Sequence, residues 1–596
     1  MKKAGKFEAP REPAKGKLAV VLLVLACILT ISVVSVFCFL RSGDGDTHVT
    51  TTAAETVETT GEMTEEPTQP IPAETVDPTL HWKTGFVAAV GTFADYYDAY
   101  GTPAGRVLRG AELKYEVGPD GKTWIVANET VGYLEDGAGI VTDIAESVRA
   151  QTLYVRTTVN LRDMDGKLLA TLAEKGTPLS VTGCDYVDEN GVAHMYRVTS
   201  GEQEGYIMPW YLAGSEEEAL ANYDDGSYSI HEGRGNRYGG GGAANLDYYP
   251  REKGPIPGNP MPEECRTLYL VTWCLSNVDA YIALADQCGI NAFVVDIVDG
   301  GSVGYAADVM QQYCPTAASA AQNTVEEYQT AIQKLKDAGY YVIGRITTFN
   351  DAYFVQDHPE HAITNPNGAP LRLNATYWPS PYNRTAWQYK VDLAVEAVEL
   401  MGFHEIQFDY VRFPDNTSRY EKAGTVDFHN TYGETKAQAI QRFLMYATDI
   451  LHEHGAYVSA DVFGESAFTY VTAYGQYWPA ISNVVDVISG MPYPDHFGAE
   501  GAWKPWEHPY DILYSWGRSV MARQGETATP AAVRTWIQAY NAIRPPYNVY
   551  GPDQVFAQIR ALRATGCTGG YMTWNAGSDL NKYRSLMPAF TPPDDE

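Results

Sequence analysis

The sequence predicts an α/β protein whose C-terminal part, residues 263–590, forms a (β/α)8 barrel of the TIM type. Eight short runs rich in β-branched and aromatic residues alternate there with amphipathic helical segments, which is the size and rhythm of such a barrel. Several runs follow a glycine that would end the preceding helix, as at Gly339 and Gly402. An open doubly wound sheet fits less well, because no glycine-rich nucleotide loop follows the first run.

The eight runs are the expected barrel strands: residues 267–273, 292–297, 341–346, 405–410, 457–462, 486–490, 533–538 and 570–574. Before the barrel we expect two small all-β modules, residues 81–148 and 151–215, because short alternating strands are broken there by Gly and Asp turns. Residues 216–262 are rich in Gly and Pro, and we expect a linker without a packed element.

The N-terminus predicts a single membrane-spanning helix over residues 18–40. This apolar stretch would span roughly 30 Å, the thickness of the bilayer core. Six basic residues precede it, so residues 1–17 are expected in the cytoplasm and everything after residue 41 outside. A cleaved signal peptide is the alternative, although its apolar region is usually shorter. Residues 41–80 are rich in Thr, Glu and Pro and are expected to form a disordered stalk.

Composition excludes several function classes. The net charge of -31 argues against a nucleic-acid partner, which would need a basic patch. The eight cysteines form no CxxC pair, so we expect buried free thiols; a disulfide such as Cys265–Cys314 is the alternative. The histidines show no HExxH spacing, and the run His452-Glu-His454 falls at a helix end away from the barrel mouth. We therefore expect no metal and no cofactor, with a metal-dependent hydrolase or deacetylase as the weakest alternative.

The two β modules share an order of a turn, an alternating strand, an aromatic strand and a closing Gly-Tyr-aliphatic strand. In the second module, Val159-Asn-Leu-Arg162 and Gly205-Tyr206 resemble the opening and closing strands of bacterial SH3-like domains. The first module is similar but lacks a clear opening motif. The resemblance implies binding of cell-wall peptide or glycan, and a spacer without a ligand is the alternative.

Carboxylates, aromatic rings and amides gather where the predicted barrel strands end. In this fold the chemistry lies at the C-terminal ends of the strands. These groups can protonate a glycosidic oxygen, stabilise an oxocarbenium ion and bind a sugar. The predicted substrate-binding residues are Trp273, Asp296, Asp299, Arg345, Arg412, Tyr493, Asp495, Gln538, Trp574 and Asn575.

Three carboxylates are the predicted catalytic residues. Asp409 ends a buried strand three residues before Arg412, which would lower its pKa and keep it ionised; a structural Asp–Arg pair is the alternative. Asp461 lies at the same depth on the next strand, and Glu465 follows in the loop. One of these two is the candidate general acid, with Asp461 preferred. For Asp296 and Asp299 we favour shaping the site or orienting Arg345 over a direct part in catalysis.

Residues 266–586 resemble the glycosyl hydrolase domain family DUF4015. The matching pieces are Val294–Gly300, Phe408–Pro414, Ser459–Gly464 and Trp574-Asn575, of which Asp-Tyr-Val-Arg-Phe-Pro, within Phe408–Pro414, is the most specific. The resemblance implies a TIM barrel related to α-amylase and α-galactosidase type hydrolases, with Asp409 on the fourth strand as nucleophile.

Two functions follow as hypotheses. The first is a membrane-anchored extracellular glycoside hydrolase that acts on a cell-wall or capsular polysaccharide through paired carboxylates. The second is a catalytically silent scaffold that holds polysaccharide or peptidoglycan near the membrane. The sugar, the linkage, the stereochemistry and the oligomeric state are left open by the sequence.

Overall fold

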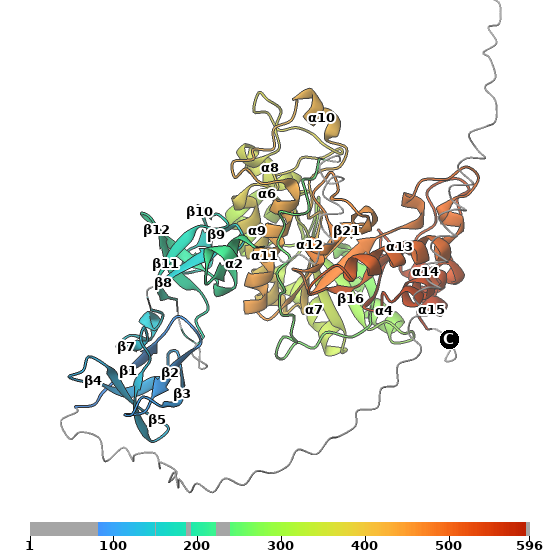
Figure 1. Cartoon of the computed structure of the whole chain (residues 1–596). Coiled ribbons are helices and arrows are strands. Elements are labelled where there is room, and N and C mark those ends of the chain that lie inside the picture. Colours follow the sequence, from blue (N-terminus) through green and yellow to red (C-terminus); the bar gives the residue numbers. More distant parts are fainter. Residues whose placement is uncertain (1–80, 150, 186, 188–191, 222–238, 592–596) are drawn as a thin grey trace, which may run out of the picture. The chain divides into compact units, whose positions relative to one another are not determined.

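The computed structural model describes residues 81–591 except 150, 186, 188–191 and 222–238 (Figure 1). The predicted membrane helix at residues 18–40 and the stalk at 41–80 lie outside the described residues. Within the described ranges, no helix combines the length and the apolar character needed to cross a membrane.

Two curled, all-β modules precede the barrel, and they share one strand order. In the first, the sheet runs β3-β2-β6-β5-β4-β1-β7, and in the second β10-β9-β13-β12-β11-β8-β14, which is the same order shifted by seven strands. The bounds are β1 Lys83–Ala88, β2 Phe93–Tyr97, β3 Pro103–Leu108, β4 Glu112–Val117, β5 Thr123–Ala127, β6 Thr130–Leu134, β7 Gly139–Val141, β8 Gln151–Val155, β9 Val159–Arg162, β10 Leu168–Ala173, β11 Pro178–Cys184, β12 Tyr196–Ser200, β13 Gln203–Ile207 and β14 Leu212–Ala213.

Alternation along the strands builds the core of each module. In β11, for example, Leu179 and Val181 are buried while the residues between and beside them are exposed, so one face of the strand packs inward. Gly205 lets β13 pack closely on β9, because a Cβ atom there would come within 2.9 Å of Leu161. The two all-β modules are therefore present as expected, and their likeness to SH3 domains stays a prediction.

Among the described residues, nine parallel strands form a nearly closed barrel, in the order β23-β22-β21-β20-β19-β16-β15-β25-β24. Only Arg534 separates β23 from β24, and its backbone N–H donates to Ile488 of β22, so these two pieces act as one interrupted strand. The bounds are β15 Cys265–Leu270, β16 Ala292–Asp299, β19 Tyr341–Thr347, β20 Glu405–Asp409, β21 Tyr457–Phe463, β22 Val487–Met491, β23 Ala532–Val533, β24 Thr535–Gln538 and β25 Gly570–Trp574. A short side ribbon, β17 (Ser302–Tyr305) and β18 (Ala321–Asn323), extends from β16.

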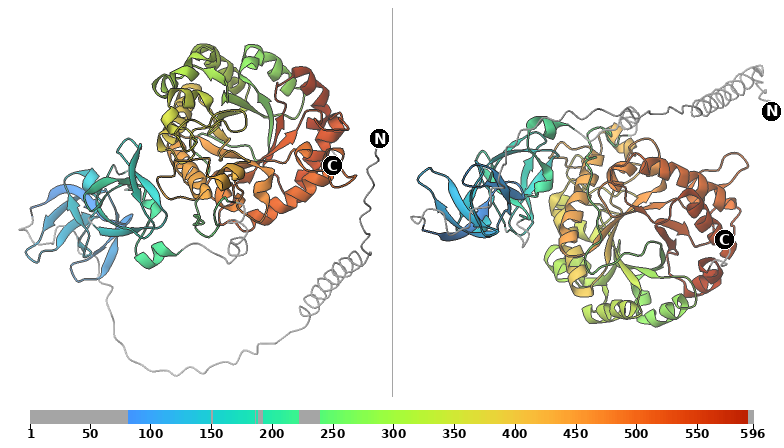
Figure 2. Two further views of the ribbon diagram at one scale, coloured as in Figure 1. Left: turned by 90° about the horizontal axis from the view of Figure 1, so that it is seen from above. Right: turned by 60° about the horizontal axis from the view of Figure 1, so that its bottom comes forward.

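Helices follow the barrel strands and surround them, as the left view of Figure 2 shows. The main helices are α4 Val278–Ala285, α7 Val325–Asp337, α9 Arg384–Met401, α11 Lys436–Glu453, α12 Trp478–Ser482, α13 Pro509–Gln524, α14 Pro552–Thr565 and α15 Leu580–Phe590. Thr324 and Glu327 form a capping box that starts α7. Gly402 ends α9 in the left-handed conformation, φ 68°, as the sequence predicts.

Every predicted barrel strand is found, and each end falls within three residues of its expected place. The six described cysteines (Cys184, Cys265, Cys274, Cys288, Cys314 and Cys567) are free thiols, and all but Cys288 are buried. Cys265 and Cys314 are thus not bridged in this structure.

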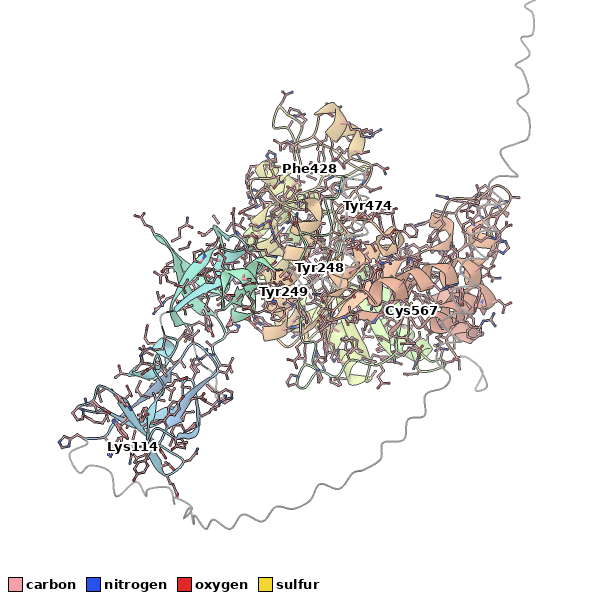
Figure 3. All side chains as sticks on the ribbon, viewed as in Figure 1. Lys114, Tyr248, Tyr249, Phe428, Tyr474 and Cys567 are labelled. Atoms are coloured by element: carbon pink, nitrogen blue, oxygen red, sulfur yellow. The ribbon has the colours of Figure 1, made fainter. Side chains whose placement is uncertain are left out.

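The segment that was expected to be an unpacked linker differs from that expectation. It begins with helix α2, Glu216–Leu220, and its later part packs against the barrel. Leu246 and Tyr248 are buried in a small cluster with Val471 and Tyr477; Figure 3 labels Tyr248 beside the barrel helices. Apolar side chains within a Gly- and Pro-rich stretch explain this, because they gain more from burial than the chain loses by ordering.

A buried carboxylate on α11 joins the second β module to the barrel. Asp449 accepts hydrogen bonds from Arg162 of β9 (3.2 Å) and from the hydroxyl of Tyr211 (2.5 Å), and it also pairs with Arg251. At the end of the same helix, Glu453 contacts His194 of the module. The module is therefore held by charged contacts as well as by apolar packing.

Candidate active site

A cavity of about 260 Å³ lies at the C-terminal ends of the barrel strands. Seven barrel strands converge on it or directly precede a lining residue, so the closed sheet itself builds the site. Its wall is formed by Asp299, Arg345, Asp409, Tyr410, Arg412, Phe463, Met491, Tyr493, His496, Trp536 and Trp574.

The guanidinium of Arg345 is the electrostatic centre of this cavity. Its Nη1 lies 2.7 Å from Asp296 Oδ1 and 3.3 Å from Asp299 Oδ1, and its Nη2 lies 2.5 Å from Asp409 Oδ2. Its Nε lies 3.9 Å from Asp461 Oδ2. Four carboxylates from the neighbouring strands β16, β20 and β21 thus surround one fully buried cation on β19.

Burial raises the pKa values of two of these carboxylates, Asp461 and Asp296. The pKa of Asp461 is raised well above its usual value because the side chain is fully buried and lies close to the charge of Asp409. Burial also raises the pKa of Asp296 to about 7, although Arg345 and the Tyr269 hydroxyl (2.5 Å) both favour its ionised form. Protonated Asp461 is therefore favoured over its ionised form by burial and by Asp409, and the charge of Arg345 opposes this effect.

Asp409 itself is held by the backbone that follows it. Strand β20 is buried along its whole length and ends at Asp409, whose Oδ1 accepts a hydrogen bond from Tyr410 N–H at 2.6 Å. Tyr410 has a φ of 48°, in the left-handed region that a bulky side chain rarely adopts. Backbone strain of this kind persists where the surrounding structure imposes it, and it often marks functional sites.

Aromatic rings form much of the rest of the cavity wall. Trp574 stacks on Tyr269 with ring centroids 4.8 Å apart, and Trp536 meets Trp574 edge to face at 5.5 Å. Tyr493 lies 6.5 Å from Trp574 in a roughly parallel orientation. Trp536 also donates its Nε1–H to Asp461 Oδ1 at 2.8 Å. Apolar ring faces beside fixed carboxylates are suited to the alternating apolar and hydroxyl surfaces of a sugar.

The expected Asp409–Arg412 ion pair is not formed, which corrects the sequence-based prediction. Arg412 lies on the cavity wall but pairs with Asp415 at 3.3 Å, and its guanidinium packs over the ring of Phe463. Arg345 takes the place beside Asp409. The loop after β20 turns Arg412 away, because the left-handed residue Tyr410 redirects the chain immediately after the strand.

Two predicted residues, Asp495 and Gln538, form hydrogen bonds within loops and are not on the cavity wall. Both carboxylate oxygens of Asp495 accept hydrogen bonds, from the Tyr540 hydroxyl (2.8 Å) and from Ile543 N–H (3.1 Å). Gln538 accepts from the backbone N–H of Asp495 at 3.2 Å. The two side chains therefore hold the loops after β22 and β24 together.

Five further predicted residues also lie outside the cavity wall, and two of them, Asp296 and Asp461, are the buried neighbours of Arg345 described above. Glu465 accepts hydrogen bonds from the hydroxyls of Tyr470 (2.7 Å) and Tyr474 (2.9 Å). Trp273 is 55% exposed in the turn after β15. Asn575 donates to the backbone of the loop before α15.

Five wall residues were not among the predicted ones: Tyr410, Phe463, Met491, His496 and Trp536. Trp536 could have been found, because it lies two positions before Gln538 and therefore on the same face of the strand. Phe463 and Met491 are the last residues of their strands, and their apolar side chains do not distinguish a cavity residue from a core residue in the sequence.

Residues 267–580 match the family described as "Putative glycosyl hydrolase domain", DUF4015. The chain belongs to this family. The family therefore accounts for the barrel and its cavity, and the β modules lie outside the matched residues.

Solved structures give distant similarities. A hypothetical protein from Ruminiclostridium thermocellum is 34% identical over 33% of this chain and 97% of its own, with a TM-score of 0.28. A chitobiase from Flavobacterium johnsoniae is 12% identical over 56% of this chain and 48% of its own, with a TM-score of 0.36. A GH20 exo-β-N-acetylglucosaminidase from Vibrio harveyi is 12% identical over 56% of each chain, with a TM-score of 0.36. No curated protein matches the sequence.

Proposed function

We propose that the protein is a membrane-anchored, extracellular glycoside hydrolase that cleaves a cell-wall or capsular polysaccharide by means of paired carboxylates. Membership of the glycosyl hydrolase family supports the reaction class. The observation that carries the proposal is the placement of Asp409 and Asp461 near one guanidinium, that of Arg345, with Asp409 on the wall of a cavity rich in aromatic rings.

Asp409 is the candidate nucleophile of the pair. Its Oδ2 contacts the guanidinium of Arg345, and its side chain is on the cavity wall, so it can attack an anomeric carbon or stabilise the positive charge that develops there. Asp461 is the candidate general acid, because burial and the neighbouring Asp409 raise its pKa. One oxygen of each lies within 3.9 Å of a nitrogen of the same planar guanidinium, so these oxygens lie less than roughly 10 Å apart, as a glycosidase carboxylate pair requires.

Asp299 competes with Asp461 for the second role. Asp299 is on the cavity wall and 35% exposed, whereas the Asp461 side chain is fully buried. Asp461 has the raised pKa that suits a general acid, and Asp299 has the better access to a substrate. Rate losses in the two Asp→Asn variants separate these roles, because the residue that donates the proton to the leaving group has the larger effect on substrates with poor leaving groups.

The predicted membrane anchor and the β modules support the extracellular location that we propose for the barrel. The apolar segment at 18–40 and the basic residues before it support an outward-facing barrel. The second module, joined to the barrel through Asp449, would place wall polymer near the cavity.

The test is hydrolysis by the full-length protein of wall and capsular polysaccharides and of aryl α- and β-glycosides. Wild type is expected to release reducing ends, and Asp409→Asn is expected to lose at least about 10³-fold in rate. Asp415→Asn is the matched control, because Asp415 pairs with Arg412 on the same loop without contacting Arg345. Equal rates for wild type and Asp409→Asn would contradict the proposal.

The silent scaffold is the second candidate, and the full burial of Asp461 favours it. A barrel of this kind would bind polysaccharide without turnover. Polysaccharide binding that Trp574→Ala abolishes, together with no hydrolysis across the panel, would establish it.

A further inference from the structure

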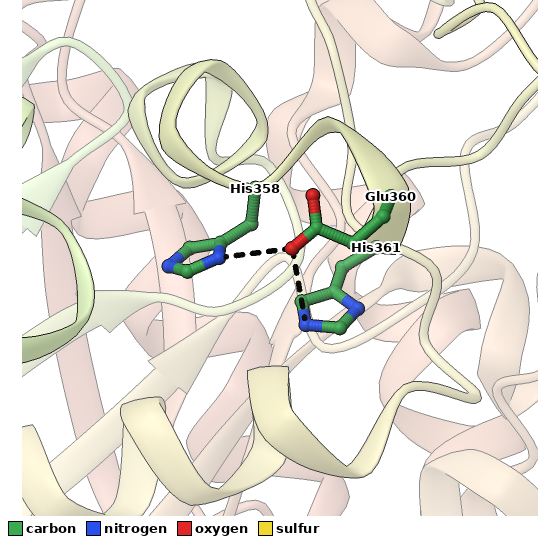
Figure 4. A group of neighbouring side chains, drawn as sticks. All are labelled: His358, Glu360 and His361. Carbon is green, nitrogen blue, oxygen red and sulfur yellow. Dashed lines mark hydrogen bonds and ion pairs between the residues drawn. The ribbon is translucent and has the colours of Figure 1, made fainter.

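Two histidines and a glutamate meet outside the candidate active site, as Figure 4 shows. His358, Glu360 and His361 each offer one ligand atom, and these atoms all lie within 4.8 Å of one another. They follow α8 (Ala352–Asp357) in the loop after β19. None of the three lines the catalytic cavity.

Local structure brings the three side chains together. Helix α8 ends at Asp357, its C-cap His358 leaves the helical conformation (φ -132°, ψ 66°), and Pro359 then starts the 3-10 turn Pro359–His361. A residue spacing of three in such a turn places His358 and His361 on one side. Their rings are nearly parallel with centroids 5.5 Å apart, and Phe354 packs against both.

The hydrogen bond at the far side of His358 fixes its tautomer. His358 Nε2 lies 2.7 Å from the carbonyl oxygen of Tyr313, which can only accept, so Nε2 carries a hydrogen. In the neutral ring Nδ1 is then an unprotonated lone pair, and it points at Glu360 Oε1 from 3.2 Å. A lone pair and a carboxylate oxygen repel each other unless a proton or a metal ion lies between them. A backbone carbonyl behind the ring is also the usual arrangement for a metal-bound histidine.

His361 faces the same oxygen. Its Nε2 lies 3.8 Å from Glu360 Oε1, and its Nδ1 lies 3.0 Å from Asn383 Nδ2. Asn383 Oδ1 meanwhile accepts from Ala386 N–H at 2.8 Å, where it caps the start of α9. A metal ion on Nε2 would move the ring hydrogen to Nδ1 and require an acceptor oxygen from the Asn383 side chain.

We propose that His358 Nδ1, Glu360 and His361 Nε2 bind one divalent transition-metal ion of the zinc class. Two imidazole nitrogens and one carboxylate are a ligand set typical of Zn²⁺, and three protein ligands leave a tetrahedral position open. Glu360 and His361 also line a second cavity, of about 730 Å³, so the ion is accessible from it. The site is independent of the proposed glycosidase function.

The experiment measures zinc binding to the full-length protein after removal of metal by a chelator and dialysis. Calorimetric titration with Zn²⁺ and mass-spectrometric metal content are expected to give one high-affinity ion per chain. Co²⁺ is expected to give the visible absorption of a tetrahedral complex, whereas Mg²⁺ does not compete. The absence of stoichiometric zinc, or an affinity for Zn²⁺ no higher than that for Mg²⁺, would overturn the proposal.

Variants locate the ion. His358→Gln, Glu360→Gln and His361→Gln are each expected to weaken zinc binding at least about 10-fold. Glu360 is 61% exposed, so its variant folds even if the histidine variants do not. His454→Gln is the matched control: His454 also contacts a glutamate, Glu399, at 3.0 Å, and it is outside this group of three. Equal zinc affinity in Glu360→Gln and wild type would refute the site.

A gain of affinity provides the sharpest test. In Asn383→Asp, one carboxylate oxygen can cap Ala386 N–H while the other accepts from His361 Nδ1–H, which is the carboxylate–histidine–metal arrangement. Zinc is therefore expected to bind at least about 10-fold more tightly. Unchanged or weaker binding would show that His361 does not hold the ion through Nε2.

Discussion

Arg345 donates to Asp409 over 2.5 Å, although 64 positions separate the two residues in the chain. The contact forms because β19 and β20 are parallel neighbours, with Arg345 paired to Gln407 in the register. Arg412, only three residues from Asp409, contacts Asp415 instead. Strand pairing therefore decides which cation accompanies this carboxylate.

Arg345→Met should destabilise the barrel strongly. The variant leaves Asp296 and Asp409 buried without their counter-ion, so we expect a loss of about 3–5 kcal/mol in the free energy of unfolding. Urea denaturation measures it. Arg106→Met is the control, because Arg106 forms an exposed pair with Asp95 that is worth at most about 1 kcal/mol. Similar losses in the two variants would contradict this account.

Trp536→Phe should expose the dependence of Asp461 on one hydrogen bond. The change removes the Nε1–H donor to Asp461 Oδ1, and the bond is expected to account for about 1–3 kcal/mol of stability. Because the bond lowers the pKa of Asp461, its loss raises that pKa further, and the infrared band of the protonated acid should persist to higher pH. Trp506→Phe removes a buried indole whose Nε1 has no hydrogen-bond partner among the described residues. An equal loss in both variants would assign the effect to lost volume alone.

The contact between His194 and the barrel should weaken at high pH. Hydrogen bonds with Asp185 and Glu453 raise the pKa of His194 to about 9 from a usual 6.5. The stabilisation is therefore complete below about pH 6.5 and is lost as the pH rises through about 9. Solvent screening limits it to about 1–2 kcal/mol. Hydrogen exchange of residues 151–213 at pH 6.5 and 9.5 measures it, and His194→Gln should remove most of the difference. A variant with the wild-type pH dependence would rule out His194 as its source.

Asp449→Asn should loosen the second β module. The variant leaves the guanidinium groups of Arg162 and Arg251 without their carboxylate, and we expect a loss of about 3 kcal/mol in the free energy of unfolding. Proteolysis between the module and the barrel should accelerate. Asp279→Asn is the control, since its exposed contact with Lys334 contributes little. Unchanged proteolysis in Asp449→Asn would contradict this role.

Sequence patterns were sufficient for the barrel strands because a buried strand needs a continuous β-branched or aromatic run, and such runs are visible without tertiary information. The strand ends were also sufficient to select Asp409, Arg345 and Trp574. They were not sufficient to tell a cavity residue from a loop residue. Asp495 and Gln538 occupy suitable positions, yet neighbouring backbone groups use their polar atoms.

The group of His358, Glu360 and His361 is a candidate site that sequence patterns did not reveal. Its spacing, His-Pro-Glu-His, matches no metal motif, because the proline turn and not a regular helix brings the side chains together. Only the fold reveals that Tyr313 and Asn383, from distant segments, lie behind the two rings.

The contacts of the segment before the barrel determine where a recombinant fragment that contains the barrel should begin. Asn259 donates to the carbonyls of His404 and Gly455, and Ile256 N–H donates to Tyr457, so this segment caps the lower ends of two strands. A recombinant fragment starting at residue 263 would lose these contacts, and the aromatic side chain of Tyr248 would no longer cover Val471. Soluble expression of the barrel domain should therefore require a start point at or before residue 239, and shorter fragments should aggregate.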